Sequence, residues 1–139
     1  NIGNNTSRGV ELEARWQAGR TLRISGNFNY RDDSTYNTVP DRNAYLRADW
    51  AFMPNWNWNV QANWIGKHAL QPGDPRLPMD AYTLVDTTLR YSPRSNWEFA
   101  ASIRNLFDVD AREYSNSAAL RTNLPLPRRS VYAELRYRF

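Results

Sequence analysis

The chain has 139 residues, of which 41% are hydrophobic, and its mean hydropathy is −0.77. No segment approaches the roughly 18 consecutive apolar residues of a membrane-spanning helix, so helical membrane proteins are excluded, whereas a transmembrane β-barrel is not, because its strands are apolar only at every second position. The absence of cysteine excludes disulfides and thiol chemistry, and the net charge of +4 is spread along the chain, which argues against a nucleic-acid-binding patch.

Seven segments alternate between apolar and polar residues. In the first, Val10, Leu12 and Ala14 alternate with Glu11 and Glu13, the period-2 pattern of a strand with one apolar and one polar face. The seven segments are residues 10–18, 22–30, 44–52, 57–64, 83–91, 97–104 and 130–139. Their length is close to the roughly 9–11 residues with which a tilted strand crosses a bilayer, whereas soluble strands average about 5–6.

The connections between these segments alternate in length. Residues 18–21, 53–56 and 92–96 are short and rich in turn-forming residues, whereas 32–42, 67–80 and 108–127 are long and polar. Outer-membrane barrels place short turns on the periplasmic side and long loops outside the cell. The pattern predicts an all-β fold, an antiparallel transmembrane β-barrel segment whose polar residues line the lumen.

The last segment has apolar residues at every second position and ends on an aromatic residue, Phe139. In an outer-membrane barrel the final strand closes the barrel, and its aromatic residue belongs at the lipid–water boundary. Leu135, Tyr137 and Phe139 are therefore the residues that we expect to serve assembly and closure. Deletion of Phe139, or replacement of Leu135 by Arg on the lipid face, is expected to impair assembly.

The aromatic residues gather near the two ends of the predicted strands. Aromatic rings with a polar edge favour the membrane–water interface, so two belts are predicted, with small or aliphatic residues between them. The belt at the short-turn ends contains Trp16, Trp50, Trp58, Tyr91 and Trp97. The belt near the long-loop ends contains Phe28, Tyr30 and Trp64.

Seven strands do not make a complete bacterial barrel, because single-chain barrels usually have an even number of strands and lipid does not tolerate unpaired strand edges. We therefore expect residues 1–139 to be the C-terminal portion of a larger barrel domain. Two alternatives remain open at this point: the last strands of a passive porin or an adhesin-type barrel, and a soluble β-barrel that binds an apolar ligand inside.

Local motifs at the predicted strands and turns resemble those of TonB-dependent receptors of the bacterial outer membrane. They are "GVELE" at residues 9–13, "Y-x-x-x-D" at 82–86, "NLFD" at 105–108, and a "P-x-P-G-R"-like stretch at 125–129 in which Arg128 occupies the position where Gly is common. Their order along the chain, together with the terminal aromatic strand, extends the resemblance over essentially the whole sequence.

The resemblance implies a 22-stranded barrel filled by a plug domain, a class of transporter that imports a scarce ligand such as an iron–siderophore complex. It also implies, as partners, the remainder of the barrel and the plug, TonB acting through the plug, the barrel assembly machinery, outer-membrane lipid and lipopolysaccharide. The plug itself lies outside these residues. Nothing in the family pattern calls for an enzyme activity or a cofactor, or for nucleic acid as a partner.

No catalytic or metal-binding constellation can be argued from the residues. The sole histidine, His68, has no identifiable partners for a metal site, and the loop acids, including Asp108 and Asp110, are interpreted as solvated turn residues. Five residues of the long loops are candidates for contact with a transported ligand. They are Tyr36, His68, Arg112, Tyr114 and Arg121.

Overall fold

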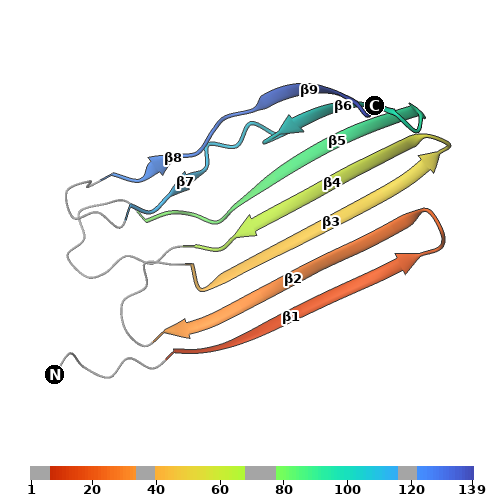
Figure 1. Cartoon of the computed structure of the whole chain (residues 1–139). Coiled ribbons are helices and arrows are strands. Elements are labelled where there is room, and N and C mark those ends of the chain that lie inside the picture. The colour runs from red at the N-terminus through yellow and green to blue at the C-terminus, as the bar shows by residue number, and fades with distance from the viewer. Residues whose placement is uncertain (1–6, 34–39, 68–77, 116–121) are drawn as a thin grey trace.

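The computed structural model describes residues 7–33, 40–67, 78–115 and 122–139, and these form one open antiparallel sheet with a small hairpin at one end (Figure 1). The strands are β1 (Ser7–Ala18), β2 (Leu22–Asp33), β3 (Arg42–Met53), β4 (Trp56–Ile65), β5 (Tyr82–Arg94), β6 (Trp97–Arg104), β7 (Arg112–Glu113), β8 (Leu124–Pro125) and β9 (Ser130–Tyr137). None of the described residues form a helix that is long and apolar enough to cross a membrane.

The large sheet is a meander with the strand order β1-β2-β3-β4-β5-β6-β9, so each strand pairs with the next long strand of the chain. The short turns lie at one end of the sheet and the long connections at the other, as Figure 1 shows. Two turns use the left-handed backbone conformation that tight reversals require, at Gly19 (φ 72°) and at Asn55 (φ 67°). The predicted sorting of short and long connections is thus confirmed.

The sheet is a single layer and has no hydrophobic core of its own (Figure 1). Among the described residues, Ala111 is the one buried hydrophobic residue, and it lies outside the large sheet. Large apolar side chains of the sheet stay exposed instead, Trp16 to 63% and Leu12 to 60%. A soluble β-sheet domain buries one face against a second layer, so this exposure favours a wall whose apolar face is covered by something other than the described chain.

Three details differ from the sequence-based expectation. The final strand was expected to run to Phe139, but β9 ends at Tyr137. Tyr137 pairs with Trp97, which is the first residue of the neighbouring strand β6. The segment 108–127 was expected to be loop, but it contains the β7–β8 hairpin. Irregular register after Trp50 and after Tyr91 places two bulge-like steps beside the short turns.

Candidate functional site

One face of the sheet is continuously apolar because the register aligns the apolar positions of all seven strands. Trp16 pairs with Ile24, Ile24 with Ala48, and Ala48 with Val60. The same row continues through Thr87 and Ile103 to Val131 in β9. Side chains alternate between the two faces of a strand. Once one row is in register, the apolar residues at alternate positions of each strand therefore all lie on the same face of the sheet.

A connected chain of aromatic rings crosses this face near the short turns, from β3 to the end of the chain. Trp56 and Tyr91 stack with centroids 4.5 Å apart, and Trp97 lies 4.6 Å from Tyr137. Six further contacts, between 5.0 and 6.4 Å, extend the chain from Phe52 and Trp50 to Phe139. Ring pairs at these separations attract one another beyond simple burial.

Four of the predicted belt residues, Trp50, Trp58, Tyr91 and Trp97, belong to this ring chain. The sequence-based interpretation missed Trp56, because it assigned residues 53–56 to a turn. The structure makes Trp56 the first residue of β4, where it pairs with Tyr91. The signal was present in the sequence, since Trp56 continues the even-numbered apolar series of Trp58, Val60 and Ala62.

The aromatic residues near the long connections are more scattered. Phe28 and Tyr30 are each 36% exposed on β2. Trp64 pairs with Ala44 on one side and Thr83 on the other. The guanidinium of Arg42 lies 5.4 Å from the centre of the Tyr30 ring, which is its cross-strand partner, a cation–π arrangement.

The opposite face of the sheet is polar and is held together by side-chain hydrogen bonds between strands. The Tyr45 hydroxyl donates to Oε1 of Gln61 over 3.0 Å, and the Gln61 amide donates to Oδ2 of Asp86 over 3.2 Å. The second oxygen of Asp86 accepts the backbone N–H of Asn105 over 2.9 Å. One connected path therefore runs from β3 across β4 and β5 to the residue that follows β6.

Ion pairs on the polar face join neighbouring side chains. Arg47 makes a two-pronged contact with Asp49, with Nε to Oδ2 at 2.7 Å and Nη2 to Oδ1 at 3.0 Å, and Asn59 also donates to Asp49. Near the short turns, Arg136 bridges Glu98 and Glu134 at 3.2 and 2.7 Å. Mixed charges that pair along one strand, as Arg47 and Asp49 do, and between strands, as Arg136 and Glu98 do, suit a hydrated wall.

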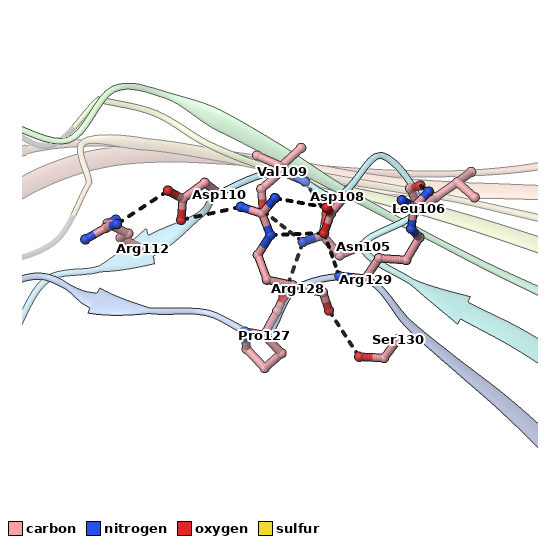
Figure 2. A network of polar contacts seen from close by, with 10 residues as sticks. All are labelled: Asn105, Leu106, Asp108, Val109, Asp110, Arg112, Pro127, Arg128, Arg129 and Ser130. Atoms are coloured by element: carbon pink, nitrogen blue, oxygen red, sulfur yellow. Dashed lines mark hydrogen bonds and ion pairs between the residues drawn. The ribbon is translucent and has the colours of Figure 1, made fainter.

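A tight turn after β6 holds a connected cluster of polar side chains (Figure 2). Asn105 is 4% exposed and has a φ of 49°. Its side-chain N–H groups donate to the carbonyls of Val109 and Pro127, and its Oδ1 accepts the N–H of Val109. Asn105 thereby joins the chain leaving β6 to the chain entering β9, since asparagine tolerates the left-handed conformation that this turn needs.

Arg128 and Asp108 complete the cluster, as Figure 2 shows. Arg128 donates from Nε and Nη2 to the two carboxylate oxygens of Asp108 over 3.0 and 2.9 Å, and the Arg129 N–H donates to Asp108 Oδ1 over 3.0 Å. The Arg128 contact above all, and then the Arg129 backbone N–H, lower the pKa of Asp108 to about 2. A carboxylate held by these donors stays ionised.

The ion pairs continue along the small hairpin. Nη1 of Arg128 lies 3.8 Å from Asp110, which also accepts from Arg112 over 3.4 Å. Asp108 and Asp110, interpreted from the sequence as solvated turn acids, are solvent-accessible in the structure and also take part in ion pairs. The partners lie 20 residues apart in the sequence, a separation that no local pattern reveals, although the "NLFD" and "P-x-P-G-R"-like motifs marked both ends of the cluster.

The predicted ligand-contact residues have different outcomes. Tyr36, His68 and Arg121 lie outside the described residues. Arg112 is exposed in β7 and pairs with Asp110, and Tyr114 is half-buried just after that strand. Within the described parts of the chain, no group of three or more His, Cys, Asp or Glu side chains is arranged to hold a metal ion.

Together, the open meander, its two chemically opposite faces and its sorted connections define a segment of an outer-membrane β-barrel wall. Residues 1–106 match the family described as TonB dependent receptor-like, beta-barrel. The match covers well over half of the chain, and the chain belongs to this family. Its members are barrels of the bacterial outer membrane, so this chain is a protein of that membrane.

Two curated relatives illustrate the similarity. The vitamin B12 transporter BtuB of Vibrio cholerae is 26% identical over 153 residues, covering 99% of this chain and 23% of the relative. The ferrichrome outer membrane transporter/phage receptor of Escherichia coli is 31% identical over 129 residues, covering 81% of this chain and 17% of the relative. The chain thus spans about a fifth of the length of these relatives.

Solved structures share the fold. The ferric-catecholate import receptor Fiu of Escherichia coli superposes with a TM-score of 0.82 at 18% identity, over 96% of this chain and 21% of Fiu. The ferric enterobactin receptor PfeA of Pseudomonas aeruginosa, as a mutant, gives a TM-score of 0.74 at 19% identity, over 100% of this chain and 23% of PfeA. The seven strands therefore have the arrangement of strands in such receptor barrels.

Proposed function

We propose that residues 1–139 form the C-terminal portion of the barrel domain of an energised outer-membrane receptor, which imports a scarce ligand such as an iron–siderophore complex. Family membership supports this reading over a passive porin, and the relatives named above are transporters and receptors rather than enzymes. The observation that carries the proposal is that the sheet of seven long strands has one unbroken apolar face and, on its other side, one hydrogen-bonded polar face.

In this proposal the chain contributes structure rather than chemistry. The apolar face meets the hydrocarbon, and the ring chain near the short turns anchors the wall at the periplasmic interface. The polar face lines the lumen, where its ion pairs can contact a plug domain. Energy reaches the receptor through TonB acting on that plug. The barrel assembly machinery inserts the strands, and no nucleic acid takes part.

Transport by the full receptor is tested by deleting the encoding gene and measuring uptake of three labelled probes: ferrichrome, a ferric catecholate and cyanocobalamin. We expect uptake of one probe class to fall to background and to return when the gene is restored. Uptake should also stop when an uncoupler abolishes the proton-motive force. Unchanged uptake of all three probes would contradict the proposed ligand range, and uptake that persists with the uncoupler would instead favour a passive pore.

The proposed ligand contacts can be tested in the same assay. We expect replacement of Arg112 and Arg121 together by Ala to weaken uptake of the ligand, because both arginines belong to long connections on the proposed outer side. Normal uptake by this double variant would remove these two residues from the ligand site. The variant Arg20→Ala, at the opposite end of the sheet, serves as a control for the loss of a positive charge.

A further inference from the structure

The side chain of Asp86 takes over from strand pairing at the point where β6 ends. The paired register of β5 and β6 runs as far as Thr87 opposite Ile103. Directly beyond this pair, Oδ1 of Asp86 accepts the backbone N–H of Asn105 over 2.9 Å. Asn105 is buried, and a buried N–H group without an acceptor is costly. The carboxylate therefore fixes the place where the chain leaves the sheet.

The second oxygen of Asp86 is tied to the wall of the sheet. Oδ2 accepts from Nε2 of Gln61 over 3.2 Å, and Oε1 of Gln61 accepts from the Tyr45 hydroxyl over 3.0 Å. These three half-buried side chains come from the neighbouring strands β5, β4 and β3. A carboxylate with a donor on each oxygen is held in one orientation, so Asp86 presents Oδ1 to the turn from a fixed position.

The turn after β6 in its turn holds the small hairpin. Side-chain hydrogen bonds of Asn105 join Val109 and Pro127, which lie at the two ends of the connection between β6 and β9 (Figure 2). Close to Val109, the buried Ala111 accepts the backbone N–H of Leu126 over 2.9 Å. The contacts therefore continue from the turn to the base of the β7–β8 hairpin.

Arg112, the first residue of β7, is directed by the same cluster. Its Nη2 lies 3.4 Å from Oδ2 of Asp110, and Oδ1 of Asp110 lies 3.8 Å from Nη1 of Arg128. Arg128 is in turn paired with Asp108. Arg112 is exposed, and a guanidinium has five N–H donors, more than its contact with Asp110 uses. A displacement of the turn therefore displaces a group that is able to bind a ligand.

We propose that Asp86 is a positioning residue for ligand binding, which sets the place of the β7–β8 hairpin and of Arg112 by holding the turn at residues 105–108. The inference rests on the proposed function, because it takes this hairpin to be part of the ligand entrance. Asp86 itself lies on the wall of the sheet and acts through the turn, whereas Arg112 touches the ligand.

The test measures uptake by the full receptor against concentration, for whichever of ferrichrome, a ferric catecholate and cyanocobalamin the wild type imports. We expect Asp86→Ala to raise the half-saturating concentration about tenfold at an unchanged maximal rate, because a hydrogen bond to a charged group is worth roughly one decade of affinity. A variant that only assembled poorly would lower the maximal rate, which follows the number of receptors, and would leave the half-saturating concentration unchanged.

Two further variants test whether Asp86 acts through the turn and through Arg112. Asp86→Asn keeps an acceptor for the Asn105 N–H, and Gln61 can rotate its amide to match, so the half-saturating concentration should return to the wild-type value. Arg112→Ala should weaken uptake about as much as Asp86→Ala, and the double variant should be no weaker. A double variant weakened about a hundredfold would mean that the two residues act independently, and would overturn the proposal.

Amide hydrogen exchange in the purified, ligand-free receptor tests the structural step by itself. We expect Asp86→Ala to speed exchange in residues 105–112 about tenfold. Thr88→Val is the matched control, because Thr88 is the next residue on the same face of β5 and bonds across to Ser102 of β6 over 2.9 Å, away from the turn. Exchange in residues 105–112 and uptake by Thr88→Val should both equal those of the wild type.

The two assays separate this inference from the proposal on which it rests. Unchanged exchange in Asp86→Ala would overturn the inference whatever the uptake result. Faster exchange at an unchanged half-saturating concentration would also overturn it, since the turn would then not govern ligand binding, and would leave the proposed transport function intact. Failure of the wild type to import any of the three probes would overturn the proposed function, and the role of Asp86 in ligand binding with it.

Discussion

At the scale of single residues, Arg128 is the most informative departure from the family pattern. It occupies a position where the resembling motif commonly has Gly, and it makes a two-pronged contact with Asp108 across the ends of β6 and β9. We predict that Arg128→Gly speeds amide hydrogen exchange in residues 105–112 and 124–130, because the Asp108 carboxylate then loses both side-chain donors and keeps the Arg129 N–H. Arg112→Gly, which removes a single 3.4 Å contact with Asp110, is the matched control and should leave residues 105–108 unchanged.

The same contact predicts a pH dependence. The pKa of Asp108 is about 2 in the folded protein against 3.8 ordinarily, so the stability it contributes is fully present above pH 3.8 and is lost as the pH falls through about 2. A carbon-13 titration of the Asp108 carboxyl should show the low midpoint in the wild type and a higher one in Arg128→Gly. Identical midpoints in the two proteins would mean that Arg128 is not the main cause.

At the scale of strands, the slope of the aromatic belt reports the tilt of the sheet. Trp16 in β1 is in register with Val131 in β9, yet the belt reaches β9 at Tyr137, six residues further on and six strand steps away. An offset of one residue per strand, with a rise of about 3.3 Å and a strand spacing of about 4.8 Å, corresponds to a tilt of about 35°. That value is typical of outer-membrane barrels.

The tilt assigns depths and so yields a graded prediction. Ala133 lies about 11 Å above the Tyr137 belt, near the middle of a roughly 25 Å apolar band, whereas Leu135 lies only about 5 Å above the belt. Ala133→Arg should therefore cost roughly 2–4 kcal/mol, and Leu135→Arg less. Heat-modifiable mobility in gels and urea titration in bilayers measure both. Ala100→Arg, on the polar face opposite Glu134, is the control, and the folded barrel should tolerate it. An equal loss of stability in all three variants would refute the assignment of the two faces.

The strands were predictable because a wall between lipid and water imposes a strict period of two on every residue that crosses it. The small hairpin β7–β8 was not, since four residues carry no period, and its place depends on the distant contact between Leu126 N–H and the Ala111 carbonyl. The same holds for the candidate site. The belt at Trp58 and Trp97 could be read from spacing, whereas the Asn105 cluster arises from contacts that only the folded chain brings together.

At the scale of the whole molecule, the described sheet stays open, with β1 and β9 as its two edges. Each edge presents backbone N–H and C=O groups that have no partner strand within the described residues, and hydrocarbon makes such groups costly by several kcal/mol each. The ordered polar face does not relieve this cost, because its hydrogen bonds join strands inside the sheet. The wall is therefore stable in a membrane only when further strands pair with both edges.

This requirement gives a prediction for residues 1–139 expressed without any neighbouring strands. We expect them to form oligomers or aggregates in detergent and lipid, through pairing of β1 and β9 between copies, and to show no monomeric, heat-modifiable species in gels. Backbone methylation at one edge, introduced by semisynthesis at a residue of β9, should then reduce this association, while the same change on a turn residue should not. A monomer that resists urea and protects the amides of both edge strands would instead mean that seven strands close on themselves, and the larger barrel would have to be abandoned.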